Sequence, residues 1–69
     1  MWDPRIINCG VVRVEHTRIK VYKDLYNYLT IDVGTPVQMA LWNGDILNVY
    51  LDNGKVRRSK DKVNYCTVG

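Results

Sequence analysis

The chain has 69 residues, of which 46% are hydrophobic and 25% are charged, and its formal net charge is +3 at pH 7. This length has room for one domain over residues 1–69, with a core too small to surround a deep substrate cavity as well. The balanced composition excludes a disordered chain, and the modest positive charge permits an acidic or nucleic-acid partner without requiring one.

The residue types favour strands over helices. Tyr occurs five times, whereas the strong helix formers Ala and Glu occur once each, at Ala40 and Glu15. Aromatic and β-branched residues pack well on a pleated surface, so we expect a mostly β domain. We expect Cys9 and Cys66 to be reduced thiols. With no secretory leader pattern and no apolar run of the ~20 residues that span a membrane, we expect a cytoplasmic protein with no membrane partner.

Residues 1–10 form a lead-in that Ile6 and Ile7 are expected to attach to the body of the domain. Strand patterns and then a helical pattern follow it. Residues 11–16 alternate in period two, which predicts a half-buried strand, and residues 18–22 continue or reverse it. Apolar residues at i, i+3, i+4 and i+7 over Tyr22–Leu29 then predict a short helix of about two turns. The alternative is a long irregular loop, since tyrosine and asparagine are mediocre helix formers. We expect no linker and no internal repeat.

The clearest hairpin signal is Asn43-Gly44, which separates two alternating runs. A two-residue loop would put the apolar residues of the two strands on opposite faces. A three-residue loop over residues 42–44 puts them on one face, pairs Met39 with Leu47, and gives Gly44 the left-handed position. We therefore prefer the three-residue loop, and the predicted core of this hairpin consists of Val37, Met39, Leu41, Leu47, Val49 and Leu51.

A second turn at residues 52–54 leads into a third strand over Lys55–Ser59. Its only apolar residue, Val56, is expected to meet Leu51 if Asn53-Gly54 is a two-residue turn. Residues 37–59 thus form a three-stranded meander, and the third strand, charged on both faces, suits a sheet edge or a functional surface. A turn at residues 60–62 precedes a last strand over Val63–Val68.

This order of elements resembles the small SH3-like barrel. Residues 33–68 look most like a Tudor-type or KOW-type module, on the pieces Val33-Gly34, Leu41-Trp42, Asn43-Gly44, Ile46 to Leu51 and Asp52-Asn53-Gly54. The resemblance implies a small barrel with a three-stranded meander and one short helix or long loop. It also implies that Trp42, Tyr50 and Tyr65 could contribute to an aromatic cage for a methylated cation.

Nothing in the sequence predicts an enzyme. His16 is the only histidine and Ser59 the only serine, and the five glycines form no phosphate-binding loop. No catalytic residue, no cofactor site and no metal site is expected, because no constellation reaches three plausible ligands. The carboxylates are scattered, and several occupy turn positions: Asp3, Glu15, Asp24, Asp32, Asp45, Asp52 and Asp61.

The densest positive stretch predicts nucleic-acid binding. Small barrels bind single strands by pairing such charge with exposed aromatic rings, and the predicted register puts two rings on the outer face of the meander. The predicted site consists of Lys55, Arg57, Arg58, Lys60, Lys62, Trp42 and Tyr50. The competing interpretation is a solvated strand whose charges prevent edge-to-edge aggregation.

The alternative function is a protein-interaction module, either an adaptor or an inhibitor domain. Trp42, Ile46 and Tyr50 would then form an exposed aromatic and aliphatic patch, of the kind that marks interfaces. A plainer interpretation is that Trp42 folds under residues 22–29 and completes the core. The two functions differ in whether the positive charges and the exposed aromatic rings share one surface.

Overall fold

The structure, a computed structural model, describes residues 2–69. Over these residues the chain is mostly β, as the composition predicts, with one short helix, α1 (Pro4–Cys9). The strands are β1 (Val12–Glu15), β2 (Arg18–Tyr22), β3 (Tyr28–Asp32), β4 (Val37–Asn43), β5 (Ile46–Leu51), β6 (Val56–Ser59) and β7 (Tyr65–Val68).

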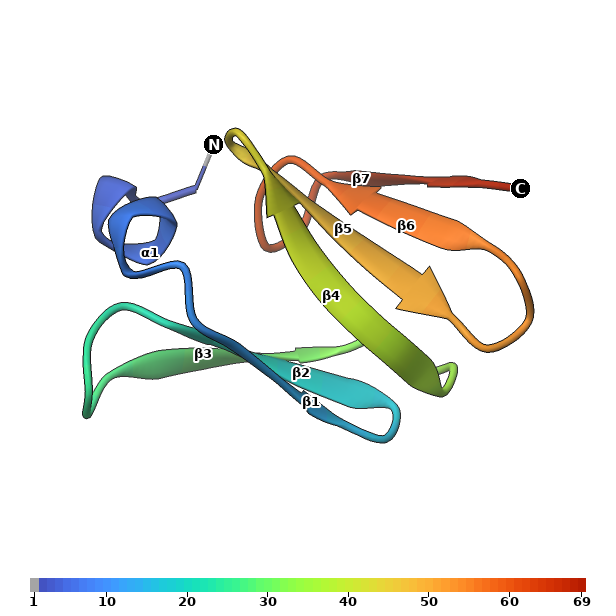
Figure 1. The fold of residues 1–69 in the computed structure, drawn as a ribbon, viewed down its shortest axis with the longest axis horizontal. Coiled ribbons are helices and arrows are strands. Elements are labelled where there is room, and N and C mark those ends of the chain that lie inside the picture. The colour runs from blue at the N-terminus through green and yellow to red at the C-terminus, as the bar shows by residue number, and fades with distance from the viewer. Residues whose placement is uncertain (1) are drawn as a thin grey trace.

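The strands form two antiparallel sheets, which we call sheet A (order β1-β2-β3) and sheet B (order β4-β5-β6-β7). Figure 1 shows the two sheets facing one another, with α1 at the end of the molecule near the N-terminus. The sheets meet where β1 packs on β4, and the Val37 N–H donates to the His16 carbonyl at 2.8 Å there. Strands β3 and β7 therefore lie on the sides of their sheets remote from this contact.

The core fills the space between the sheets and under α1. Sheet A contributes Ile19, Val21 and Ile31, sheet B contributes Leu47, Val49 and Leu51, and the N-terminal segment contributes Trp2 and Ile6. Alternation along β2 and β5 produces this arrangement, because every second residue of each strand is buried.

The lead-in is a capped helix that is attached to both sheets. Pro4 occupies the first turn, and the Asp3 carboxylate accepts the Arg5 N–H at 2.9 Å, an N-cap that satisfies one of the free donors of a helix start. The helix ends where Gly10 adopts φ 68 and donates its N–H to the Ile6 carbonyl. The Trp2 indole N–H donates to the Ser59 carbonyl at 3.0 Å, which ties this segment to β6.

The helix predicted over residues 22–29 is wrong, because this segment is the β2–β3 hairpin. Tyr22 ends β2, Tyr28 begins β3, and the two residues pair across the hairpin. The Asp24 carboxylate accepts the backbone N–H groups of Tyr26 and Asn27. Such local side-chain bonds offer the backbone an alternative to helical bonds, and here they outweigh the helical spacing of the apolar residues.

The predicted register of the β4–β5 hairpin is also wrong. Asn43 pairs with Ile46, so the loop is the two-residue turn Gly44-Asp45, with Gly44 at φ 63. A shift in register between Val37 and Met39 adds one residue to β4. Such a bulge sends the residues beyond it to the opposite face.

The core prediction for this hairpin is therefore confirmed for four of its six residues. Leu47, Val49 and Leu51 are buried, and Val37 packs against the core, as expected. Met39 and Leu41 are exposed, which corrects the prediction. In their place, beyond the bulge, Ala40 and Trp42 pack against the core.

The predicted three-stranded meander over residues 37–59 is present as β4, β5 and β6, but β7 extends it to four strands, and two details differ. Val56 pairs with Tyr50 and not with Leu51, because the connection 52–54 is a three-residue loop with Gly54 at φ 85. In addition, β6 is no sheet edge, since β7 pairs along its other side. The edges of sheet B are β4 and β7.

Candidate binding surface on the four-stranded sheet

The side of sheet B that faces away from the core, called the outer face here, is mostly apolar. Cross-strand pairing arranges it in two rows. One row runs Met39, Tyr50, Val56 and Val68, and the other runs Leu41, Asn48, Arg58 and Cys66. Of the eight side chains in these two rows, only that of Arg58 is charged.

No element in residues 2–69 covers the outer face, as Figure 1 shows. Met39, Leu41 and Val68 are exposed, while Tyr50 and Val56 are half-buried. Scattered apolar residues are normal on a protein surface, but a contiguous apolar face marks an interaction site.

A groove of about 210 Å³ lies at one end of the outer face. Its walls are Ile46, Arg58, Lys60, Cys66 and Val68. Arg58 and Lys60 are exposed, and neither forms an ion pair with a described residue. The groove therefore combines apolar walls with two uncompensated positive charges.

Two residues of the predicted nucleic-acid site lie on the inner face of sheet B. Trp42 packs edge-to-face on Trp2, with 5.5 Å between ring centroids, and so helps to complete the core under Trp2. Arg57 is only 7% exposed, and its guanidinium carbon lies 3.6 Å from the centroid of the Tyr65 ring. Its Nε atom is buried without a hydrogen-bond partner among the described residues.

Of the remaining predicted residues, Tyr50 is half-buried and the four cations are exposed, but the five do not form one surface. Tyr50 and Arg58 lie on the outer face, and Lys60 lies in the groove beside it. Lys62 belongs to the β6–β7 turn, and Lys55 precedes β6 at the opposite end of that strand. The structure thus brings together Tyr50, Arg58 and Lys60 and separates the others. The predicted cage is not assembled either, since Trp42, Tyr50 and Tyr65 do not share a face.

An internal repeat, which contradicts the expectation of none, is the main feature that the sequence interpretation missed. The segments KVYKDLYNYLTI (20–31) and RRSKDKVNYCTV (57–68) share the pattern K-D-x-x-N-Y-x-T. Both are hairpins, β2–β3 and β6–β7. A search for self-similarity at wide spacing would have found this signal in the sequence.

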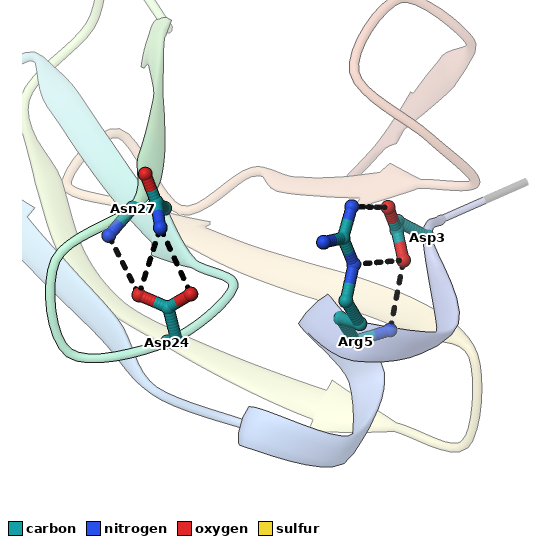
Figure 2. Close-up of polar contacts among 4 residues, drawn as sticks. All are labelled: Asp3, Arg5, Asp24 and Asn27. Atoms are coloured by element: carbon teal, nitrogen blue, oxygen red, sulfur yellow. Dashed lines mark hydrogen bonds and ion pairs between the residues drawn. The ribbon is translucent and has the colours of Figure 1, made fainter.

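The two repeats have the same turn chemistry. The Asp24 carboxylate accepts from the Asn27 side chain at 2.9 Å and from two backbone N–H groups, as Figure 2 shows in part. Asp61 accepts from the Asn64 side chain at 2.7 Å and from the backbone N–H groups of residues 63 and 64. These bonds, with the asparagine side chain foremost, lower the pKa of both carboxyl groups.

Each repeat also places a cation on the tyrosine that begins its second strand. Lys20 Nζ lies 4.9 Å from the centroid of the Tyr28 ring, and Arg57 occupies the equivalent position over Tyr65. In sheet A, Lys20 also pairs with Glu15 at 3.1 Å. Both hydrogen-bonded turns present an apolar side chain to solvent at the same repeat position, where Tyr26 is 87% exposed and Val63 is 73% exposed.

Comparison of the chain with models of protein families, with curated proteins and with solved structures gives no significant match. Within residues 2–69, no three side chains of His, Cys, Asp or Glu gather as a metal site would require. Over the same residues there is no helix of the length and apolar character needed to span a membrane. Both cysteines are free thiols, with Cys9 half-buried and Cys66 exposed.

Proposed function

We propose that this chain is a non-enzymatic protein-binding module whose binding surface is the outer face of sheet B. The observation that supports the proposal is the uncovered row Met39, Tyr50, Val56 and Val68, flanked by a second row with only one charge. Burial of apolar area at about 25 cal/mol per Å² is the dominant favourable term in most protein association.

The composition of this face favours a protein partner over a nucleic acid. Nucleic-acid-binding surfaces concentrate positive charge, because lysine and arginine side chains neutralise phosphates and release condensed counterions. Here Arg58 and Lys60 stand at one end of a face that is otherwise apolar, and Lys55 lies beyond the other end of β6. An apolar centre with a charged rim is the usual arrangement of a protein interface.

Nucleic-acid binding is the second candidate. The observation in its favour is that Tyr50, Arg58 and Lys60 stay on one side of the sheet, where a base could stack beside two phosphate contacts. The Tudor-type or KOW-type likeness of residues 33–68 agrees with either partner and with a binding module that has no catalytic residues.

The proposal can be tested by panning a random peptide library against the chain. The outer-face variant carries Leu41→Ser and Tyr50→Ser, and the matched control carries Leu25→Ser and Tyr28→Ser in the β2–β3 hairpin. We expect enriched peptides to bind the wild type and the control equally, and to bind the outer-face variant at least about tenfold more weakly, since two apolar anchors are lost. Circular dichroism would show that both variants remain folded.

Peptides that bind the outer-face variant as well as they bind the wild type would contradict the proposal. So would a complete absence of enriched peptides together with oligonucleotide binding that weakens steeply with salt, which is the result expected of the second candidate.

A further inference from the structure

Strand β7 is the least protected strand of the described chain. All four of its residues are exposed, whereas each other strand has at least one residue that is buried or half-buried. It pairs on one side only, with β6, and Figure 1 shows it along the margin of sheet B. The other edge, β4, begins in contact with β1 and with the His16 carbonyl.

The alternation of hydrogen-bonded and non-bonded pairs between β6 and β7 shows which backbone N–H and C=O groups of β7 have no partner in β6. The Lys60 N–H donates to the Asn64 carbonyl at 2.8 Å, and in an antiparallel pair hydrogen-bonded and non-bonded residue pairs alternate. Cys66 and Val68 therefore direct their backbone groups toward β6. Tyr65 and Thr67 direct their N–H and C=O groups away from the sheet.

This edge also lacks the usual protection against pairing. Natural edge strands carry lysine, proline, a bulge or a covering element. Tyr65–Val68 contains no charge and no proline, its register with β6 is regular over four residue pairs, and no described element covers it. A partner strand could therefore extend sheet B here through main-chain bonds, with side-chain pockets supplying specificity.

The side chains next to β7 indicate the charge and polarity that a partner strand would need. On the outer face, Cys66 lies next to Arg58 and Val68 lies next to Val56, so an added strand would lie directly beside Cys66 and Val68. A long acidic side chain opposite Cys66 would extend across it toward Arg58, one strand further from the edge, and an apolar side chain two residues away would meet Val68. On the inner face, the buried Arg57 has a Nε atom without a hydrogen-bond partner. Neither arginine of β6 forms an ion pair with a described residue.

We propose that β7 accepts an extended segment of a partner protein, which carries an acidic residue and an apolar residue two positions apart. This inference rests on the proposed function and names the partner's chemistry. A second copy of the chain suits the site less well, because pairing two β7 edges adds Arg58, Cys66 and Val68 of the copy and supplies no carboxylate to either groove.

The probes are two short threonine-rich peptides with the central sequences Glu-Thr-Val and Val-Thr-Glu, since the segment can run in either direction. Control peptides have Lys in place of Glu. Fluorescence anisotropy with the whole chain should show that one Glu peptide binds about tenfold more tightly than its Lys counterpart, the difference expected for a charge-assisted hydrogen bond. Arg58→Glu should reverse this preference.

The repeat supplies a matched pair of backbone variants. Thr67→Pro removes an outward N–H of β7 and leaves the bonds to β6, because proline is tolerated where an edge N–H faces solvent. Thr30→Pro makes the same change at the equivalent position of β3. We expect Thr67→Pro to weaken binding of the Glu peptide about tenfold and Thr30→Pro to leave it unchanged.

Three results would overturn the inference. The first is equal binding of the Glu and Lys peptides, or no binding of either. The second is peptide binding that survives Thr67→Pro but is lost in the Leu41→Ser, Tyr50→Ser variant, in which case the proposed function stands and strand addition fails. The third is a concentration-dependent dimer, detected by light scattering, that Thr67→Pro abolishes, because a second copy then occupies the edge.

Discussion

At the scale of single residues, the structure separates side chains that stabilise the core from side chains of the same type that do not. Val49 is completely buried between the sheets, whereas Val68 is exposed on the outer face. Val49→Ala should lower the free energy of unfolding by about 1–3 kcal/mol, through lost burial and a residual cavity. Val68→Ala should change it by less than about 0.5 kcal/mol. Urea denaturation of both variants checks this, and equal effects would contradict the assigned register.

Trp2 offers a second comparison at this scale, because its indole N–H bonds the Ser59 carbonyl inside the core. Trp2→Phe keeps the six-membered ring but removes this hydrogen bond and part of the buried indole. We expect a loss of about 1–3 kcal/mol in the free energy of unfolding, from the lost hydrogen bond and the smaller buried area. Tyr26→Phe, at an exposed turn position, should cost almost nothing by the same measurement.

At the scale of elements, the repeated turns make stability depend on pH. Hydrogen bonds to Asp24 and Asp61 lower the pKa of each carboxyl in the folded chain, whereas an unfolded aspartate titrates near about 3.9. A lowered folded pKa contributes stability above the unfolded pKa, and this contribution is lost as the pH falls through the folded pKa. The thermal midpoint should therefore decrease from about pH 5 downward.

The control for this prediction replaces the two aspartates by asparagine. Asp24→Asn with Asp61→Asn should lower the thermal midpoint at pH 7 and should flatten its decrease toward pH 3. Asp45→Asn, in the β4–β5 turn outside the repeat, should follow the wild type. A double variant that loses stability with acid as steeply as the wild type would show that other groups control the acid transition.

Sequence patterns predicted some strands and turns correctly and failed for others. Alternation correctly assigned Leu47, Val49 and Leu51 to the core, because β5 is regular and half-buried. It failed for Met39 and Leu41, because a bulge is a local backbone choice that period-two counting does not contain. It failed for residues 22–29, because the Asp24 turn depends on specific hydrogen bonds. Arg57 shows the limit for the site, since its guanidinium lies over the ring of Tyr65, a residue of another strand that the alternation of β6 alone does not reveal.

At the scale of the whole molecule, salt dependence separates the two candidate functions. If Arg58 and Lys60 contact phosphates, the log-log slope of single-strand binding against salt should include about −0.7 per contact. Arg58→Ala with Lys60→Ala should flatten the slope by roughly one to two units. Arg13→Ala, an exposed cation on sheet A, should leave it unchanged. A flat titration of the wild type at low salt would exclude nucleic acid and leave the protein-binding module.

The open margin of β7 has a consequence for how the protein behaves in a concentrated solution. An uncharged strand edge is a template on which further molecules can grow, and the remaining general barrier is the mutual repulsion of chains with a net charge of +3. Salt screens that repulsion beyond a Debye length of about 8 Å at physiological ionic strength. Colloidal stability should therefore decrease as salt rises. A partner strand bound at the β7 edge would keep the protein soluble under these conditions, because it blocks the template.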